Sequence, residues 1–234
     1  MHVTCTFSWN DHALALYSNA SSRLGLLKRT LHFVKYQKQK RDFYIAVVRS
    51  QFEHCVQVWR PSSVTLLDKL ERIQRRAVKW ILSEYDYHYN DFEYLNRLRD
   101  LDLLPLKYRF MLSNLVLFYN IYNNKSCVKL PGYYVPITNE DKNRLRMTIK
   151  PPNYLGGNET LINLENMRKI KNNDLSLKCV TAAHSSTFKN SFFFRTVQEW
   201  NHIPIEIRSA ENLPAFKDTL RVYLKKIAFE MEPD

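Results

Sequence analysis

Residues 64–82 read VTLLDKLERIQRRAVKWIL, and they show the clearest two-faced pattern in this chain of 234 residues. Apolar side chains recur at three- and four-residue spacing, which places one stripe on a single side of an α-helix: Leu66, Leu70, Ile73, Ala77 and Trp80. Cationic side chains follow the same spacing on the other side: Arg72, Arg75, Arg76 and Lys79. The pattern predicts a helix with one buried face and one basic face.

Helical periodicity also extends to both sides of this segment. It predicts an amphipathic helix from Ser8 to Val34 and a buried helix over Lys38–Trp59, followed by helices at Asp91–Asp100, Pro105–Asn123, Ser191–His202 and Asn212–Glu230. Between residues 126 and 189 the periodicity fades among prolines, glycines and asparagines, where we expect loops with a short strand or two near Leu145–Ile149 and Leu175–Val180. The predicted fold class is therefore mainly α.

The predicted organisation has four consecutive parts. Residues 1–84 form an antiparallel helical bundle, and residues 85–125 continue it as a helical pair. Residues 126–189 form a loop-rich connector, and residues 190–234 form a second helical region.

Positive charge is concentrated in the first third of the chain. The protein has 35 Lys and Arg against 23 Asp and Glu, and residues 1–80 alone hold 14 of the cations but only 5 of the acids. An excess of this kind favours a polyanionic partner, and we predict nucleic acid. The candidate phosphate-binding residues are Arg72, Arg75, Arg76 and Lys79, supported by Lys28 and Arg29. The alternative is a solvated cationic face without a ligand.

Several functional classes lack the residues that they need. Only 4 glycines occur, so glycine-rich nucleotide loops are excluded, and no Asp-Asp pair is available for a two-metal site. The cysteines Cys5, Cys55, Cys127 and Cys179 show no zinc-ligand spacing and are read as reduced thiols. We therefore predict no catalytic residue, no metal and no cofactor for this chain alone.

Targeting and membrane signals are also missing from the sequence. No apolar run approaches the ~20 residues of a membrane helix, so no membrane partner is predicted. The first 20 residues lack a basic region followed by an apolar stretch, which is the form of a secretory signal. The expected location is intracellular, with nucleus and cytoplasm not distinguished.

An aromatic run near the C-terminus has two interpretations. Phe188, Phe192, Phe193, Phe194 and Trp200 lie close to Lys189 and Arg195, and exposed rings in a basic groove stack single-stranded bases. Packing into a core is the favoured interpretation, because three consecutive phenylalanines on a helix cannot all face water.

Several motifs occur together in the order found in one known family. They are FSWNDH (7–12), ASSRLGLLKR (20–29), VRSQFEH (48–54), LERIQRRA (70–77), LDLLPL (101–106), NSFFFRT (190–196) and WNHIP (200–204). Together they resemble the region beyond the palm of non-LTR retrotransposon reverse transcriptases of the jockey-like kind. The likeness spans almost the whole chain and is weakest from 126 to 185, and Phe194 stands where the family commonly carries proline.

The resemblance implies a function for this segment. In that family a helical thumb grips template and primer behind the active site of an RNA-directed DNA polymerase. The fingers, the palm with its Asp-Asp doublet and the endonuclease would precede Met1, so the chain is expected to be inactive alone and a polymerase palm is an implied partner. Two alternatives stay open, namely a helical protein interaction module and a retroelement remnant without a selected activity.

Overall fold

The computed structural model describes residues 9–84, 90–137, 175–180 and 185–229. The described chain is mainly helical, as predicted. It divides into two compact units, one made of Met1–Phe110 with Tyr223–Asp234 and the other of Met111–Val222. The four sequence parts 1–84, 85–125, 126–189 and 190–234 stay a prediction.

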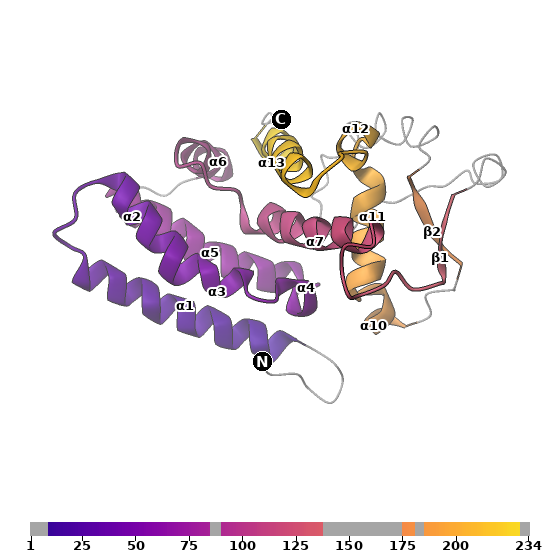
Figure 1. The fold of residues 1–234 in the computed structure, drawn as a ribbon. Coiled ribbons are helices and arrows are strands. Elements are labelled where there is room, and N and C mark those ends of the chain that lie inside the picture. The colour runs from indigo at the N-terminus through magenta and orange to yellow at the C-terminus, as the bar shows by residue number, and fades with distance from the viewer. Residues whose placement is uncertain (1–8, 85–89, 138–174, 181–184, 230–234) are drawn as a thin grey trace. The chain divides into compact units, whose positions relative to one another are not determined.

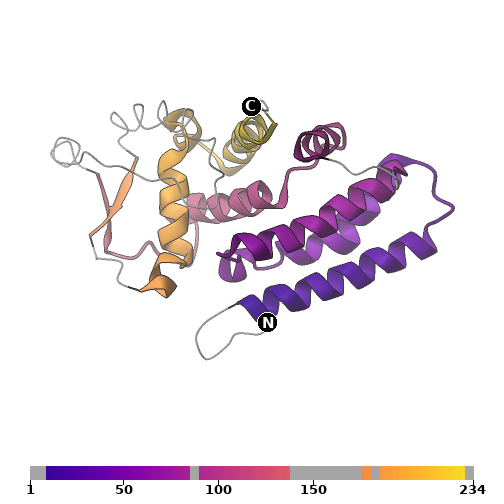
Figure 2. The same ribbon diagram turned by 180° about the vertical axis from the view of Figure 1, so that it is seen from behind.

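Three helical rods that alternate in direction build the first part of unit 1. The first rod is α1 (Asn10–Thr30), and the third is α5 (Val64–Leu82). The middle rod consists of α2 (Gln37–Phe43), the π-helix η1 (Tyr44–Arg49), α3 (Ser50–Glu53) and α4 (Val56–Trp59). Figures 1 and 2 show from two sides that α1 and α5 run the same way, with the middle rod returning between their ends.

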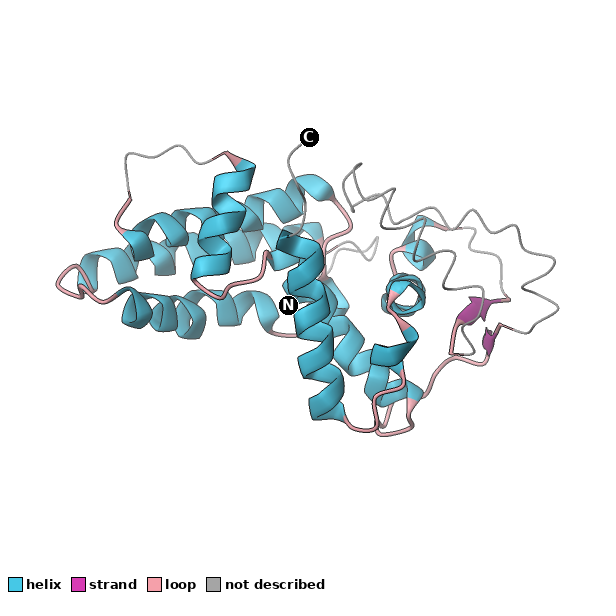
Figure 3. Cartoon of the chain, turned by 90° about the horizontal axis from the view of Figure 1, so that it is seen from above, coloured by secondary structure: helices cyan, strands magenta, loops and turns pink. Residues whose placement is uncertain are grey.

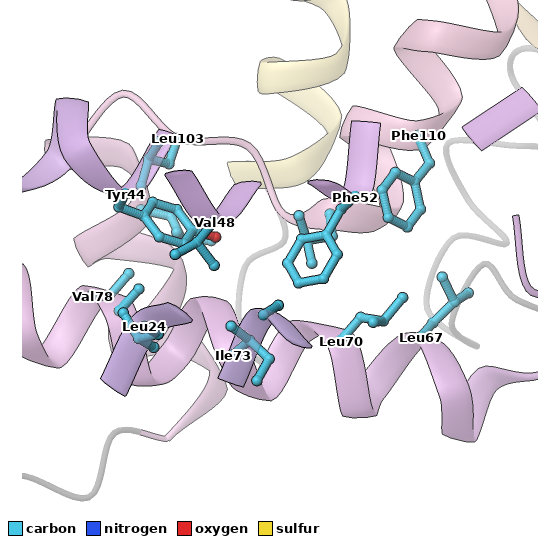
Figure 4. Packing of buried hydrophobic residues seen from close by; sticks show 14 of the residues in the cluster. Leu24, Tyr44, Val48, Phe52, Leu67, Leu70, Ile73, Val78, Leu103 and Phe110 are labelled. Carbon is cyan, nitrogen blue, oxygen red and sulfur yellow. The ribbon is translucent and has the colours of Figure 1, made fainter. Parts of the chain in front are cut away.

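The core of unit 1 forms where these rods meet. Leu24 of α1, Tyr44 and Phe52 of the middle rod, and Leu70 and Ile73 of α5 are almost completely buried. Figure 4 shows the side chains of η1 and α3 facing those of α5. The whole predicted stripe of α5, from Leu66 to Trp80, is at most 8% exposed. Its burial confirms the prediction made from the spacing of residues 64–82.

The middle rod corrects the prediction of one continuous helix over Lys38–Trp59. Its helical hydrogen bonds change to the π type at Tyr44–Arg49. They stop at His54, which is extended, and at Cys55, which has a positive φ of 50°. The indole Nε1 of Trp59 donates to the His54 carbonyl at 2.7 Å, so the break is hydrogen-bonded. Trp59 itself is fully buried.

Helices α6 and α7 follow the sequence prediction closely. Helix α6 (Asp91–Asp100) begins with a capping box, in which Asn90 Oδ1 accepts from Glu93 N at 2.8 Å and Glu93 accepts from Asn90 N at 3.2 Å. Helix α7 (Leu106–Tyr122) starts directly after Pro105, a residue suited to a first helical turn. The predicted connection at residues 85–90 lies outside the described residues except for Asn90.

A buried polar network fastens α5 to the turn between α6 and α7. The Glu71 carboxylate accepts from Leu106 N at 2.8 Å, from Gln74 Nε2 at 3.1 Å and from the Tyr94 hydroxyl. Gln74 Nε2 also lies 3.1 Å from the Leu104 carbonyl, and Gln74 Oε1 accepts from Tyr44 at 3.0 Å. Burial raises the pKa of Glu71 despite these donors. The motifs at 70–77 and 101–106 therefore bind each other directly.

A second charged contact joins the middle rod to the first turn of α7. Arg109 donates to both Glu53 oxygens at 2.8 and 2.9 Å, and Arg49 lies 3.0 Å from the same carboxylate. Burial opposes ionisation of Glu53, but the two arginines hold its pKa below the usual value. The bidentate pair fixes the orientation of α3 against α7 within unit 1.

We predict that Glu71→Ala destabilises the protein strongly. The substitution leaves the Leu106 N–H and the Tyr94 hydroxyl without their acceptor, and such losses cost about 2–4 kcal/mol. Urea unfolding followed by circular dichroism measures the change. The exposed Asp68→Ala on the same helix is the control and should change stability by less than about 0.5 kcal/mol. Equal effects of the two substitutions would contradict the role given to the network.

Unit 2 contains a small two-stranded sheet that lies beside a helix (Figure 1). Strand β1 (Tyr134–Pro136) pairs antiparallel with β2 (Leu177–Cys179), and α10 (Ser186–Lys189) leads into α11 (Phe192–His202). The chain continues through α12 (Ile205–Arg208) into α13 (Leu213–Phe229), and Asn212 caps α13 by accepting from Ala215 N at 2.9 Å. Figure 3 colours the two strands magenta among the cyan helices.

The WNHIP motif (200–204) connects α11 to β2. Asn201 accepts from Leu177 N at 3.0 Å and donates to Leu177 O at 2.7 Å, so its amide substitutes for a neighbouring strand. The indole of Trp200 donates to the Leu175 carbonyl at 3.0 Å. Trp200 also contacts the rings of Phe118 and Phe216 in the core of unit 2. This sequence motif thus has a structural role in the protein.

The strand predictions have different outcomes. The expected strand near Leu175–Val180 is present as β2, whereas Leu145–Ile149 lies outside the described residues. Strand β1 was missed, because three residues that end in Pro136 show no alternation long enough to predict a strand.

We predict that Asn201→Ala lowers the stability of unit 2 by about 1–3 kcal/mol, since it leaves both polar groups of the buried Leu177 backbone without partners. Hydrogen exchange measured by mass spectrometry should show faster exchange in β2. The exposed Asn190→Ala is the control. Unchanged exchange at β2 in the Asn201 variant would refute the strand-like role of this amide.

Candidate nucleic-acid interface

The cations of α1 and α5 meet because these two helices pack side by side in the same direction. Arg76 of α5 donates to Ser21 of α1 at 2.9 Å. Lys28 lies two turns further along α1, close enough to Arg76 and Lys79 for their positive charges to act on its ammonium group. Residues 51 positions apart in the sequence are thereby brought into one charged cluster.

The pKa of Lys28 reflects the repulsion between the cations of this cluster. Its pKa is lowered first by partial burial and then by the positive charges of Arg76 and Lys79. Arg76 and Lys79, whose charges lower this pKa, are both cations. Such a neighbourhood favours the approach of an anion that is shared by the three side chains.

Two further predicted residues lie at the surface of the same helices. Arg72 is exposed one turn before Arg76 on α5. Arg29 is exposed in the last turn of α1, where a cation also interacts favourably with the helix dipole. We call Lys28, Arg29, Arg72, Arg76 and Lys79 the cationic face.

Arg75 has partners on α6 and is not counted in the cationic face. Its guanidinium is 2.5 Å from Asp91 and sits 4.2 Å from the ring centre of Tyr94, so it contacts α6. The Asp91 side chain is 87% exposed, which makes this a surface ion pair of modest energy. The sequence pattern grouped Arg75 with its neighbours, but the structure gives it a local acidic and aromatic partner.

Lys40 is a buried cation that the sequence analysis did not single out. Its Nζ donates to the Trp80 carbonyl at 3.3 Å and to Ser83 Oγ at 2.9 Å, which caps the C-terminal end of α5. Lys40 therefore holds the start of the middle rod against the end of α5 that carries Lys79. The absence of any acid between Asp11 and Asp42 could have drawn attention to this region.

The acids near the Leu-rich turn are engaged in ion pairs. Asp102 contacts Lys225 at 2.5 Å and Arg41 at 3.6 Å, and Asp100 lies 4.0 Å from Arg97. Among the described residues no group of three or more His, Cys, Asp or Glu could hold a metal ion. In the same part of the chain Cys55, Cys127 and Cys179 are free thiols.

The aromatic run of unit 2 is largely packed against itself and the sheet. Phe188 contacts Tyr133 and Phe194, and Phe193 contacts Tyr134, with ring centres 5.7–6.2 Å apart. Trp200 is fully buried. The four phenylalanines are half-buried by this packing, and Trp200 alone of the run lies fully in the core.

Comparisons with known proteins add no assignment. No family model, no curated protein and no solved structure matches this chain. Within the described ranges, no helix has the combination of length and hydropathy that crossing a bilayer requires. The functional conclusion therefore rests on the geometry of the cationic face.

We predict that Lys28→Met raises the melting temperature at low salt while weakening polyanion binding. The substitution removes a charge that is repelled by Arg76 and Lys79, and a gain of up to about 3 °C is expected at about 0.02 M NaCl. The gain should shrink at about 0.5 M NaCl, where screening weakens the repulsion. Differential scanning fluorimetry measures both values.

Lys217→Met is the matched control, because Lys217 is an exposed lysine of α13 that belongs to unit 2 and not to the cationic face. It should leave the melting temperature nearly unchanged at either salt concentration. A fall in the melting temperature of Lys28→Met at low salt would show that Lys28 makes a net favourable ion pair instead.

Proposed function

We propose that this chain binds the sugar-phosphate backbone of nucleic acid through the cationic face, without sequence specificity. The observation that carries the proposal is the convergence of Lys28 from α1 with Arg76 and Lys79 from α5. The buried stripe on the opposite side of α5 holds Arg72 and Arg76 toward solvent.

The physical basis is the relief of repulsion by a polyanion. Cations held together by helix packing repel each other, and phosphates placed between them replace repulsion with attraction. Each phosphate that is neutralised also releases condensed counterions, which is the main source of affinity in nonspecific binding. Contacts of this kind position a backbone and read no base edges.

The resemblance to non-LTR retrotransposon reverse transcriptases extends this proposal to a larger context. In our proposal the chain acts as the thumb-like C-terminal part of such an RNA-directed DNA polymerase and holds template and primer. The polymerase chemistry of that family needs an Asp-Asp palm, and this sequence contains no Asp-Asp pair. A palm domain is therefore the proposed catalytic partner. Two of the motifs that carry the resemblance, at 70–77 and 101–106, bind each other directly in the fold.

We predict that the triple variant Arg72→Glu, Arg76→Glu and Lys79→Glu loses most of its affinity for nucleic acid. Reversal of three charges replaces attraction of phosphates with repulsion, and we expect a loss of at least about 100-fold at about 0.1 M salt. Filter binding with a labelled 20-base-pair duplex measures it.

The matched control carries the same change of charge in unit 2, namely Lys129→Glu, Lys189→Glu and Lys217→Glu at three exposed lysines. Its affinity should fall far less, because only the long-range field changes. Thermal melting of both variants verifies that each is folded. Equal losses in the two variants would show that net charge, and not the cationic face, determines binding.

A further inference from the structure

The connection between α1 and α2 exposes two large aromatic rings to water. Phe33 is 68% exposed and Tyr36 is 73% exposed, although both lie within a six-residue connection. Exposed apolar residues are common one at a time, and they include Leu26 on α1 and Phe43 on α2 as well as Val58 on α4 and Phe92 on α6. Two exposed rings three positions apart form a distinct surface.

The connection is held in place at both of its ends. Leu31 packs against the core of unit 1, its N–H bonds to the Leu27 carbonyl at 2.9 Å, and its own carbonyl accepts from Val34 N at 3.1 Å. At the other end Tyr36 caps α2, where its carbonyl accepts from Lys40 N at 3.2 Å. Because the backbone at both ends is already held in place, a ligand that binds the two rings causes little further loss of conformational entropy.

Positive charge surrounds these rings. From His12 to Arg41 the sequence has seven Lys and Arg and no Asp or Glu. Lys35 lies between the two aromatic positions and Lys38 follows them, and both lysines are exposed. The surface therefore combines aromatic rings with cations, and proteins that bind single-stranded nucleic acid use this combination to stack bases and to hold phosphates.

The rings also adjoin the cationic face. Helix α1 ends at Thr30, so Phe33 follows Lys28 and Arg29 by only a few residues. Because α1 and α5 run the same way, Lys79 lies near the same end of the bundle, to which Lys40 fastens α2. Figure 1 shows the α1–α2 connection at that end of the three rods. A strand whose phosphates lie on the cationic face can therefore reach the two rings.

We propose that Phe33 and Tyr36 form a stacking platform for unpaired bases, which makes single-stranded nucleic acid, or a duplex with a single-stranded extension, the preferred ligand. The inference rests on the proposed backbone binding and adds the class of nucleic acid to it. Base stacking on aromatic side chains tolerates any sequence, so the platform agrees with binding that reads no base edges.

A membrane surface is less well suited to this region. Peripheral helices that enter a bilayer present a continuous apolar face, whereas the two exposed leucines of α1, Leu14 and Leu26, stand among exposed polar residues: Ser18, Asn19, Ser22 and Arg23. Two rings separated by a lysine offer little apolar area. Anionic vesicles are nevertheless included in the test, because they share the attraction to cations.

The test compares the full chain with its double variant Phe33→Ala and Tyr36→Ala. Affinities are measured by fluorescence anisotropy for a 20-nucleotide oligo(dT), a 20-nucleotide oligo(U) and a blunt 20-base-pair duplex. We expect the double variant to lose between about 5-fold and about 100-fold in affinity for the two single strands. Its affinity for the blunt duplex should stay within about 2-fold of the wild type.

Two controls make the result specific. The double variant Val58→Ala and Phe92→Ala removes exposed apolar side chains elsewhere in unit 1 and should bind all three probes as the wild type does. Tyr36→Phe keeps the ring and should retain single-strand affinity, which separates stacking from hydrogen bonding by the hydroxyl.

Each failure has its own signature. Equal affinities of wild type and Phe33→Ala/Tyr36→Ala for oligo(dT) and oligo(U), with duplex binding intact, overturn the platform and leave the proposed function standing. Failure of the wild type to bind any of the three nucleic acids overturns both. Binding to phosphatidylserine vesicles that is lost in the double variant, with single-strand affinity unchanged, overturns the platform in favour of a membrane.

Discussion

Burial of the apolar stripe of α5 determines how unit 1 presents its charges. Leu70, Ile73 and Ala77 lie in the core between α1 and the middle rod, so the rotation of α5 about its axis is fixed. A helix that buries one side must expose the other, and this constraint turns Arg72 and Arg76 outward. The same packing aligns α1 with α5 and brings Lys28 to Arg76 and Lys79. The charge cluster is therefore a consequence of core packing.

The Glu71 network shows how a partly buried acid is compatible with a basic helix. Glu71 directly precedes Arg72 in the sequence, but its carboxylate turns inward to Leu106 N, Gln74 and Tyr94. The acid is thus removed from the cationic face and used to connect α5 with the start of α7. The inward turn of Glu71 removes one negative charge from the cationic face, and the exposed Asp68, one turn before Arg72, is the acid that remains on that side of α5.

Several periodic segments with end signals were predicted well from the sequence, because spacing and caps are local properties. The first helix is an exception, since it was predicted to reach Val34 and ends at Thr30. Helix α6 has the predicted bounds, and α11 and α13 begin within one residue of prediction. The middle rod was not predicted correctly, because apolar residues on all sides give no signal for a change of hydrogen-bond type. Cys55 adopts a positive φ without being glycine, so the break also lacked a turn signal.

The candidate site was predictable in its residue types and only partly in its geometry. The position of Arg75 depends on Asp91, which lies 16 residues away on another helix. The spacing of residues within α5 does not predict this contact. The meeting of Lys28 with Lys79 depends on the direction in which two separate helices pack. The exposure of Phe33 and Tyr36 is likewise a tertiary property, since an aromatic residue in a sequence is more often buried.

The salt dependence of wild-type affinity for a blunt duplex tests the central claim most directly. If the five side chains of the cationic face contact phosphates, the logarithm of the association constant should fall with the logarithm of salt concentration with a slope between about −3 and about −5. A slope near zero would contradict the account, because binding would then not depend on the release of counterions from the backbone.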